Sequence, residues 1–555
     1  MAFTFMENRR GCDVVSYSWT ISILPRVTSL LFVASIVMVL AFAGCMVGPN
    51  YHEPITQMEQ QWSEPGYASI QRSPIELVNW WKTFNDPVLD DLVERAYQNS
   101  PTLHAAAVRV LQAQAARGIA IGLLFPQRQE ASGGFSWNQV SENRGGPKQE
   151  TSKLGSGLAI IRDPFGTLAQ KAIGQPGIDP AFHNWEITAF SASWELDIWG
   201  RFRRGIEAAD ATVLASLASY DDVLVSLIAE VATNYVLLRT LEEQLDIIQQ
   251  NVQIQKASLT IVQLRREGGT ATELDVAQAQ SQLYDTEALV PATQASIRQT
   301  QIALCIAMGI PPRDISDLIG PKRPIPSPPE MIAVGVPAEL LRRRPDVRRA
   351  ERQLQAQSTR IGIAVADLLP SFSLAGDIGW SAENFSDVWK GSSFQAFGGP
   401  SFRWAILNYG RIINNVRLED AAFQAAINDY EALVLRAQGE VESAIARLAG
   451  AQQQIIPLTD STQAASRAVD IASQQYKVGT ADYIRVLVAQ QSLVAQQSRL
   501  ISTRGSAAQN MISLYRALGG GWEMRSGNNL VPADIKDQMK KRTYWGSMIN
   551  ADCAK

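Results

Sequence analysis

The fold is decided by residues 206–267, which read IEAADATVLASLASYDDVLVSLIAEVATNYVLLRTLEEQLDIIQQNVQIQKASLTIVQLRRE. These 62 residues contain neither glycine nor proline. An uninterrupted helix of that length would extend about 93 Å, far longer than an ordinary globular helix. Apolar side chains recur here at spacings of three and four, at Leu224, Leu227, Ile228, Val231, Tyr235 and Leu238. The segment is therefore predicted to be one long helix that packs as in a coiled coil.

Glycines interrupt this helix and the helical pattern then resumes, which predicts a long hairpin. A similar hairpin is predicted nearer the C-terminus. The expected helices and turns are 206–267, Gly268-Gly269 and 270–308 in the first hairpin, and 412–478, Gly479 and 480–518 in the second. Bends or local breaks are expected at Gly439, Gly450, Pro457 and Gly505. Two shorter helices are predicted at residues 88–121 and 346–367.

The two halves of the chain repeat one another. An offset of 210 positions relates Trp194-Glu-Leu-Asp-Ile-Trp-Gly200-Arg201 to Trp404-Ala-Ile-Leu-Asn-Tyr-Gly410-Arg411, and Gly269-Thr270-Ala271 to Gly479-Thr480-Ala481. Upstream, an offset of about 244 relates Arg117-Gly-Ile-Ala and Leu124-Phe125-Pro126 to Arg360-Ile-Gly-Ile-Ala and Leu368-Leu369-Pro370. Such constancy indicates a duplicated structural unit. The first copy therefore has an insertion of about 34 residues between Trp137 and Trp185, where glycines and prolines predict a long loop.

Four segments alternate apolar and polar residues with the period of two that β-strands show. Their apolar members are Phe135 and Trp137; Phe190, Ala192, Trp194 and Leu196; Phe372, Leu374, Ile378 and Trp380; and Phe402 and Trp404. Strands of about 9–11 residues with aromatic ends suit a membrane barrel, although a half-buried sheet of a soluble protein would alternate in the same way. Known membrane barrels need at least about eight strands, so four per chain require an oligomer.

The N-terminus has the features of a secretion signal. Arginines precede an apolar run at residues 27–43, which is about 17 residues long and shorter than the roughly 20 that a spanning helix needs. A retained anchor is the alternative. Ala41-Phe42-Ala43-Gly44-Cys45 resembles the lipobox of bacterial lipoproteins, so cleavage before Cys45 and acylation of that cysteine are expected. Met46, where Asp would signal inner-membrane retention, implies delivery to the outer membrane.

Composition argues against nucleic-acid binding and catalysis. The 555 residues are 19% charged and 46% hydrophobic with a formal net charge of −4, and the charges are interspersed rather than gathered in a basic block. Four cysteines and three histidines are scattered without metal-ligand spacing. No phosphate-binding loop, nucleophile elbow or cluster of histidines and carboxylates is found. The sequence therefore predicts no catalytic residue, no metal site, no cofactor and no nucleic-acid partner.

Five further segments stand in a fixed order along the chain. They are CMVGPNYHEP at 45–54, WWKTFNDP at 80–87, WELDIWGR at 194–201, LLRRRPDV at 340–347 and LGGGW at 518–522. In this order they resemble the outer-membrane factor family, the TolC, OprM and NodT-like channels of tripartite efflux pumps. Each segment alone is weak, but their order and spacing are specific, and the resemblance covers almost the whole chain after residue 44.

The resemblance implies a mainly α-helical chain with a transmembrane β-barrel. Three chains would each give four strands to a twelve-stranded barrel, and their helices would continue it as a periplasmic tunnel. It also implies outer-membrane lipid, a periplasmic adaptor and an inner-membrane pump as partners. The hairpin tips that would contact the adaptor are Gly268, Gly269 and Thr270, and Val478, Gly479 and Thr480. Glycine is expected at each tip because a tight reversal requires backbone freedom.

Family members narrow the periplasmic entrance with residues after the second tip, commonly including acidic groups. The candidates here are Asp275, Asp482, Arg485 and Val488. Val488 stands where OprM-like members carry Asp, so an ordinary aspartate ring is not expected. Charges on an exposed helix surface, with no role in a gate, are the alternative for these residues.

The sequence thus predicts an outer-membrane channel subunit that passively conducts small molecules, such as drugs and toxic compounds, in a tripartite efflux system. A conduit for type I protein secretion and a structural coiled-coil lipoprotein are the alternatives. The predicted domains are a signal peptide (1–44), an acylated segment (45–86), a first repeat (87–320), a second repeat (321–522) and an unassigned tail (523–555). The sequence does not identify the exported compound.

Overall fold

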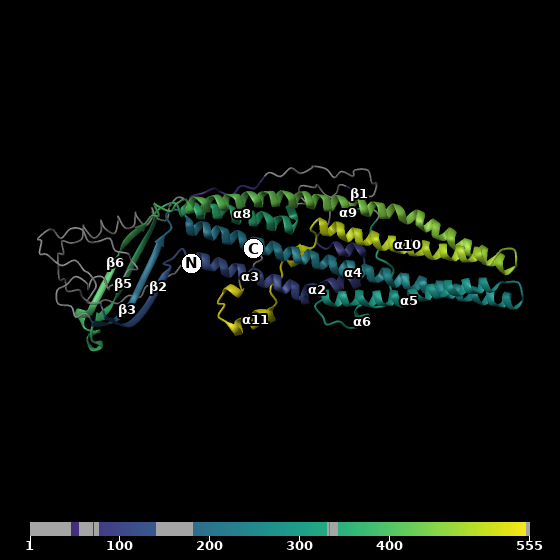
Figure 1. The fold of residues 1–555 in the computed structure, drawn as a ribbon, viewed down its shortest axis with the longest axis horizontal. Coiled ribbons are helices and arrows are strands. Elements are labelled where there is room, and N and C mark those ends of the chain that lie inside the picture. Colours follow the sequence, from purple (N-terminus) through teal and green to yellow (C-terminus); the bar gives the residue numbers. More distant parts are fainter. Residues whose placement is uncertain are drawn as a thin grey trace, which may run out of the picture. The chain divides into compact units, whose positions relative to one another are not determined.

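The computed structural model describes residues 46–54, 70–71, 77–139, 181–329, 332–333 and 342–550. The predicted signal peptide, Cys45 and the predicted long loop from residue 140 to 180 lie outside these residues. The chain forms two compact units, whose elements are labelled in Figure 1. The first includes Leu124–Arg203 and Ala366–Leu407, and the second includes Gly48–Leu123, Arg204–Val365 and Asn408–Lys555.

The first unit contains a four-stranded antiparallel sheet in the order β2-β3-β5-β6. Its strands are β2 (Arg128–Gln139), β3 (Ala181–Leu196), β5 (Ser371–Ala382) and β6 (Phe394–Arg403). They confirm the four strands predicted from alternation. Trp404, expected inside the last strand, lies just beyond the end of β6, where its indole N–H donates to the carbonyl of Leu368 at 3.0 Å. That hydrogen bond replaces the sheet pairing that the pattern suggested.

One face of this sheet is mainly apolar and the other is mainly polar, although Phe397 lies on the polar face opposite Asp377. On the apolar face, Phe135 lies opposite Trp185 with ring centroids 4.8 Å apart, and Phe372 lies opposite Phe402 at 6.3 Å. The register assigns to the other face Ser132, Ser136, Asn184, Glu186, Ser191, Ser193, Ser373, Asp377, Ser381 and Ser401. A barrel strand needs this division, with apolar side chains toward lipid and polar ones toward the lumen.

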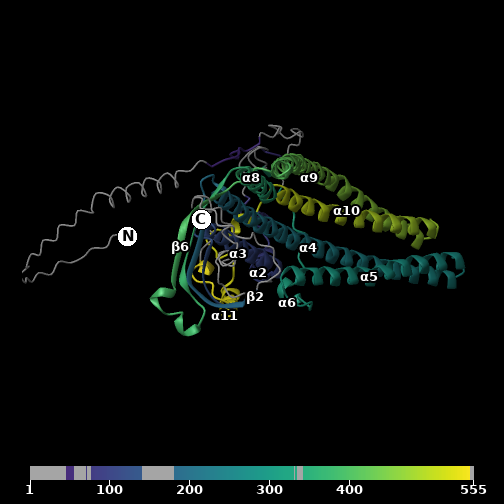
Figure 2. The same ribbon diagram turned by 60° about the vertical axis from the view of Figure 1, so that its left-hand side comes forward.

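Two long helical hairpins dominate the second unit (Figure 2). Their helices are α4 (Arg201–Glu267) with α5 (Glu273–Ala307), and α9 (Arg411–Lys477) with α10 (Tyr483–Ala517). Within the described residues, α4 alone has an 18-residue window apolar enough to cross a membrane, and half of that window is buried. Its apolar face packs in the protein core, as the spacing of three and four predicts.

The breaks predicted in the second hairpin are wrong. Both α9 and α10 run as continuous helices through Gly439, Gly450, Pro457 and Gly505. A proline inside a helix costs about 3 kcal/mol and a glycine about 1 kcal/mol, which the tertiary packing of so long a helix offsets. Gly505 has a packing reason as well, because a Cβ there would lie 2.5 Å from the Thr240 hydroxyl oxygen of α4.

The helix predicted at 88–121 is two helices, α2 (Pro87–Asn99) and α3 (Pro101–Gly122). Ser100 is extended between them (φ −63°, ψ 117°), because a residue before proline is driven away from the helical region. The other predicted short helix is confirmed as α8 (Pro345–Ala366). The remaining elements are β1 (Ile70–Gln71), η1 (Trp80–Phe84), α6 (Ser316–Ile319), β4 (Ile332–Ala333), η3 (Phe385–Asp387), η4 (Gly391–Ser393), η5 (Trp522–Arg525), α11 (Ala533–Arg542) and η6 (Met548–Asn550).

The predicted internal duplication is confirmed by the lengths of the paired elements. Helices α4 and α9 both have 67 residues, and α5 and α10 both have 35. Helices α3 and α8 both have 22 residues, and strands β2 and β5 both have 12. Each copy therefore supplies a short helix, two strands and a long hairpin.

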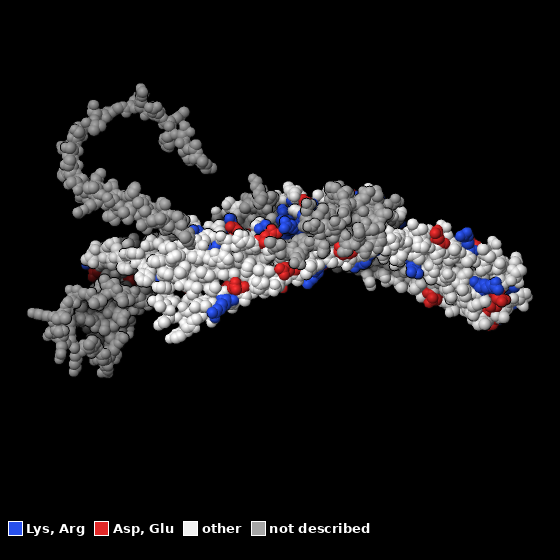
Figure 3. Space-filling view, turned by 90° about the horizontal axis from the view of Figure 1, so that it is seen from above, with Lys and Arg blue, Asp and Glu red and all other residues white. Residues whose placement is uncertain are grey.

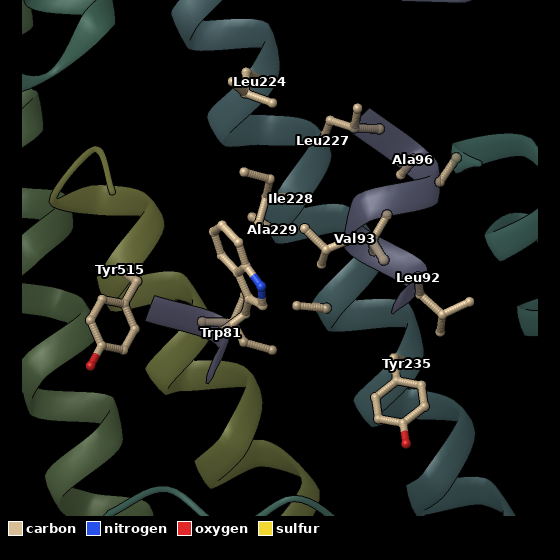
Figure 4. Close-up of a cluster of buried hydrophobic side chains, with 14 of the residues drawn as sticks. Trp81, Leu92, Val93, Ala96, Leu224, Leu227, Ile228, Ala229, Tyr235 and Tyr515 are labelled. Carbon is tan, nitrogen blue, oxygen red and sulfur yellow. The ribbon is translucent and has the colours of Figure 1, made fainter. Parts of the chain in front are cut away.

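The main core lies in the second unit and gathers side chains from distant parts of the chain. The Trp80 ring stacks on Tyr515 of α10 at 5.1 Å, and Figure 4 shows the Trp81 indole beside Ile228 of α4. The described part of the tail joins this core, because Val531, Met539 and Ile549 are buried in it. The segment from 523 to 550 is therefore an integral part of the second unit.

An ion-pair cluster also holds the beginning of this tail. Asp221 of α4 is fully buried, and its carboxylate accepts from Arg525 at 2.5 Å and from Arg348 at 3.5 Å. The two guanidinium groups also lie against the ring of Trp522, 4.9 Å from its centroid for Arg348 and 5.5 Å for Arg525. Burial raises the pKa of Asp221 to about 6, although the two arginines act to lower it.

Candidate channel entrance

The first hairpin tip is a tightly closed turn. Gly269 has φ +72°, which only glycine adopts readily, and the Thr270 N–H reaches back to the Arg265 carbonyl at 2.8 Å. Helix α5 then starts with a capping box: the Asp275 N–H donates to the Thr272 hydroxyl at 3.2 Å, and the Thr272 N–H donates to the Asp275 carboxylate at 2.9 Å. The structure thus places Asp275, a predicted entrance residue, in a helix cap.

The second tip has the same backbone but a different cap. Gly479 has φ +82°, and the Thr480 N–H donates to the Gln475 carbonyl at 2.9 Å. Asp482 is the N-cap of α10, yet its side chain makes no capping hydrogen bond. The 210-residue offset explains the difference, because Asp482 stands where the first copy has Thr272 and Arg485 stands where it has Asp275. An aspartate and an arginine cannot form the reciprocal cap of a hydroxyl and a carboxylate.

Three predicted entrance residues remain exposed at this second tip. Asp482 caps α10, and Arg485 and Val488 lie three residues apart in its first two turns. Residues at that spacing share one face of a helix. The side chain of Val488 is 57% exposed, so a chain taken by itself leaves this apolar group in water. The structure therefore places these three candidates together at the start of α10, whereas Asp275 is held in the cap of α5.

The two tips are joined by Arg265, a residue that the sequence analysis did not select. Its guanidinium donates to the Tyr476 carbonyl and lies 4.5 Å from the centroid of the Tyr476 ring. An apolar cluster beneath this contact joins all four helices and contains Val262, Val276, Ala279, Tyr476, Tyr483, Val486 and Leu487. The sequence does show a basic residue in the last turn of the predicted helix. Because basic residues are favoured at the C-terminus of any helix, this feature alone could not identify Arg265 as a contact between the tips.

The residues after Cys45 are held in place. The Val47 N–H donates to the Trp199 carbonyl at 3.1 Å. In the second unit, Arg204 donates to Asn50 at 2.8 Å, and Gly48 packs directly on Gly362. Residues 47–50 are therefore fixed by hydrogen bonds and close packing.

Charged groups on the face drawn in Figure 3 are scattered in small mixed clusters of both signs. Within the described residues, no group of three or more histidine, cysteine, aspartate or glutamate side chains is arranged to hold a metal ion.

Comparison with known proteins agrees with these features. The sequence profile of the outer membrane efflux protein family matches residues 92–310 and 336–520. The pyoverdine export outer membrane protein OpmQ of Pseudomonas putida is 30% identical over 84% of this chain and 92% of its own length. The toluene efflux pump outer membrane protein TtgF of Pseudomonas putida is 28% identical over 89% of this chain and 98% of its own length. The solved outer-membrane channel OprN covers 86% of this chain and 100% of its own, with a TM-score of 0.76 and 29% identity.

These similarities confirm the predicted fold class, a mainly helical chain that gives four strands to a trimeric transmembrane barrel continued by a helical tunnel. They also confirm the predicted outer-membrane location and efflux-channel role. Proteins of this kind are channels, not enzymes. The chain belongs to the outer membrane efflux protein family.

Proposed function

We propose that a homotrimer of this chain is the passive exit duct for small organic molecules in a tripartite system. A periplasmic adaptor would dock on its hairpin tips, and an inner-membrane pump would supply the energy. The observation that carries the proposal is the sheet with one polar and one apolar face, joined to hairpins whose helices reach 67 residues. Three such sheets can enclose a water-filled passage, because all backbone groups then pair around a closed barrel.

The relatives support small molecules as the exported class. Their names specify a siderophore, pyoverdine, for OpmQ and an aromatic hydrocarbon, toluene, for TtgF. Neither compound is assigned to this chain. The polar face of the sheet offers hydroxyl, amide and carboxylate groups to the passage, and we propose that the pump and adaptor select the compound.

Planar-bilayer recording of the purified oligomer tests the proposal. Discrete conductance steps from a trimer are expected, together with a fall of current when the tips are capped by added adaptor. A silent trimer would contradict a conducting role and favour a structural lipoprotein. Export of a folded or unfolded protein, but of no small molecule, by cells that carry the channel would favour type I secretion.

The adaptor contact is proposed at Gly268, Gly269 and Thr270 of the first tip and Val478, Gly479 and Thr480 of the second. Exposed apolar side chains beside these turns support it. Leu274 and Ile484 occupy equivalent positions in the two copies, and both are exposed, as is Val478 at 74%. Apolar groups repeated at both tips of three chains would offer six similar docking points to a partner that also ends in helical hairpins.

The proposed entrance consists of Asp275, Asp482, Arg485 and Val488, of which Asp275 is held in the cap of α5. Arg485→Ala is expected to raise single-channel conductance about twofold, because removing one cation from each of three chains widens the entrance and lowers the barrier to cations. Reversal potential in a salt gradient should shift toward cation preference. Lys477→Ala on the far side of the same turn is the matched control, and equal effects of both variants would remove Arg485 from the entrance.

Cys45 is proposed to carry the lipid anchor. Cys45→Ala is expected to abolish incorporation of labelled fatty acid while the barrel still inserts, because a closed sheet spans the membrane without a lipid. Cys553→Ala is the matched control and should leave labelling unchanged. Labelled lipid on the Cys45 variant would overturn the assignment.

The domain boundaries are likewise proposed. A cleaved signal (1–44) would precede the acylated segment (45–86), and two repeats would follow (87–320 and 321–522), with a C-terminal tail (523–555) after them. N-terminal sequencing of the blocked and deacylated protein, and limited proteolysis of the detergent-solubilised trimer, check these limits.

A further inference from the structure

The two terminal segments of the chain pack on equivalent places of the two repeats. Gly48 of the N-terminal segment lies directly on Gly362 of α8, and Met548 of the C-terminal segment lies 3.4 Å from where a Cβ of Gly118 in α3 would be. Gly118 and Gly362 are related by the 244-residue offset of the repeat, and each is four residues before the end of its 22-residue helix. In both repeats a terminal segment thus contacts the same turn of the helix, and the approach between Gly48 and Gly362 is close enough to require glycine.

In both repeats the chain runs on from this helix end directly into a strand of the sheet. Helix α3 ends at Gly122 and strand β2 starts at Arg128; helix α8 ends at Ala366 and strand β5 starts at Ser371. Gly48 is three positions after Cys45, which would carry the proposed lipid, and this distance along the chain reaches at most about 11 Å. If that lipid holds the end of α8 at the membrane surface, then the equivalent end of α3, with the C-terminal segment on it, lies at a similar depth.

The C-terminal segment carries cationic and aromatic groups just before this contact. Lys540, Lys541 and Arg542 end α11 and are exposed, and Tyr544 follows with 95% of its side chain in water. Lysines and arginines are favoured in the last turn of any helix, so their charge alone indicates little. Their position beside Tyr544 is more informative. Cationic side chains attract anionic phospholipid headgroups, and tyrosine is enriched at the interface between membrane and water.

We propose that residues 540–545 of each chain form a second membrane contact, which binds the headgroups of anionic phospholipids in the inner leaflet of the outer membrane. The proposal rests on the lipid anchor and barrel proposed above. Charge complementarity selects the ligand: Lys541 and Arg542 form no ion pair within the described residues, whereas Lys540 is 3.8 Å from Asp537. A trimer would thus be seated on the membrane surface by three lipids and three basic segments.

The test uses the full trimer in liposomes that contain 30% phosphatidylglycerol or none. A fluorescent label on Tyr544→Cys, with Cys553 replaced by Ser, is exposed to lipids that carry a spin-label quencher on the headgroup. Strong quenching is expected at position 544 in anionic liposomes. Neutralising two cations, by Lys541→Gln with Arg542→Gln, should remove about half of that quenching or more, because each cation near an anionic surface contributes about 1 kcal/mol. High salt should have the same effect.

Matched positions make each outcome decisive. A label on His52→Cys, near the proposed lipid, should be quenched, and a label on Val478→Cys at the distant tip should not. Arg436→Gln with Arg447→Gln removes the same charge from exposed positions on α9 and should leave quenching at 544 unchanged. Quenching at 52 without quenching at 544 would overturn the second contact alone, whereas quenching at neither position would overturn the membrane anchoring on which it rests. Quenching at 544 that is the same in anionic and neutral liposomes, and that persists without both cations, would also overturn the proposed headgroup contact. It would indicate that a neighbouring chain covers this position.

Discussion

Arg265→Ala is expected to increase the fraction of time that the channel conducts by about 30-fold. The side chain joins the first hairpin tip to the second through a charged hydrogen bond to the Tyr476 carbonyl and a cation–π contact with its ring. These two contacts together contribute about 2 kcal/mol. If they form only when the entrance is narrow, their loss shifts the equilibrium between the narrow and a wider entrance by that amount. Single-channel recording of open probability measures the shift.

Arg266→Ala provides the control for this experiment. Arg266 pairs with Glu273 at 2.6 Å within the first hairpin and is exposed, so its loss removes the same charge from the same tip without releasing the second hairpin. A normal open probability for Arg265→Ala would contradict a latch between the hairpins. A matching rise in Arg266→Ala would mean that tip charge, and not the contact with Tyr476, sets the conductance.

Arg525→Ala is expected to loosen the C-terminal segment strongly. Asp221 is fully buried beneath Trp522, and Arg525 is its nearer partner. Removing one partner of a buried ion pair costs about 3–5 kcal/mol, because the other charge remains buried and unpaired. Hydrogen exchange of residues 522–531 in the detergent-solubilised trimer should therefore become about 100-fold faster or more. Arg525→Lys, which keeps the charge, should lose much less protection.

The same variant should respond to pH in a defined direction. Burial raises the pKa of Asp221 in the folded chain from its ordinary value of 3.8 to about 6, so the folded chain binds this proton more tightly than the unfolded chain. The stability that the proton contributes is complete below the lower pKa and lost as pH rises through the higher one. Arg525→Ala should thus be most damaging near pH 7.5 and least near pH 4.5, after correction for intrinsic exchange. A defect independent of pH would show that Arg525 acts through Trp522 and not through Asp221.

The long helices show which features of the fold can be predicted from the local sequence. The run from 206 to 267 was predicted as one helix and ends at the predicted residue, because the absence of glycine and proline over many turns admits few other structures. Glycines and Pro457 in the second hairpin led to wrong predictions of breaks, since their local cost is small beside the packing of the helices that contain them. The apolar spacing across Ser100 concealed the split between α2 and α3 for a similar reason.

The candidate entrance, too, could be predicted from the sequence only in part. The sequence predicted that the entrance lies beside two glycine turns. It did not predict which charged side chains there form helix caps and which remain exposed. Asp275 and Arg485 are equivalent in the repeat, yet one is held in a capping box and the other is exposed. Alignment of the two copies at the 210-residue offset already pairs Asp275 with Arg485. The consequence of that substitution for the helix cap is clear only because the structure shows the same backbone turn at both tips.

The sequence by itself determined the long hairpins, the two-faced strands, the duplication and the need for an oligomer, because each follows from spacing and composition along the chain. Only the tertiary structure decided which distant side chains meet. Arg265 and Tyr476 are 211 positions apart, Asp221 and Arg525 are 304 apart, and both pairs join helix α4 to a distant segment of the chain. Packing of whole helices brings such pairs together, and no local pattern records the rotation of one helix against another.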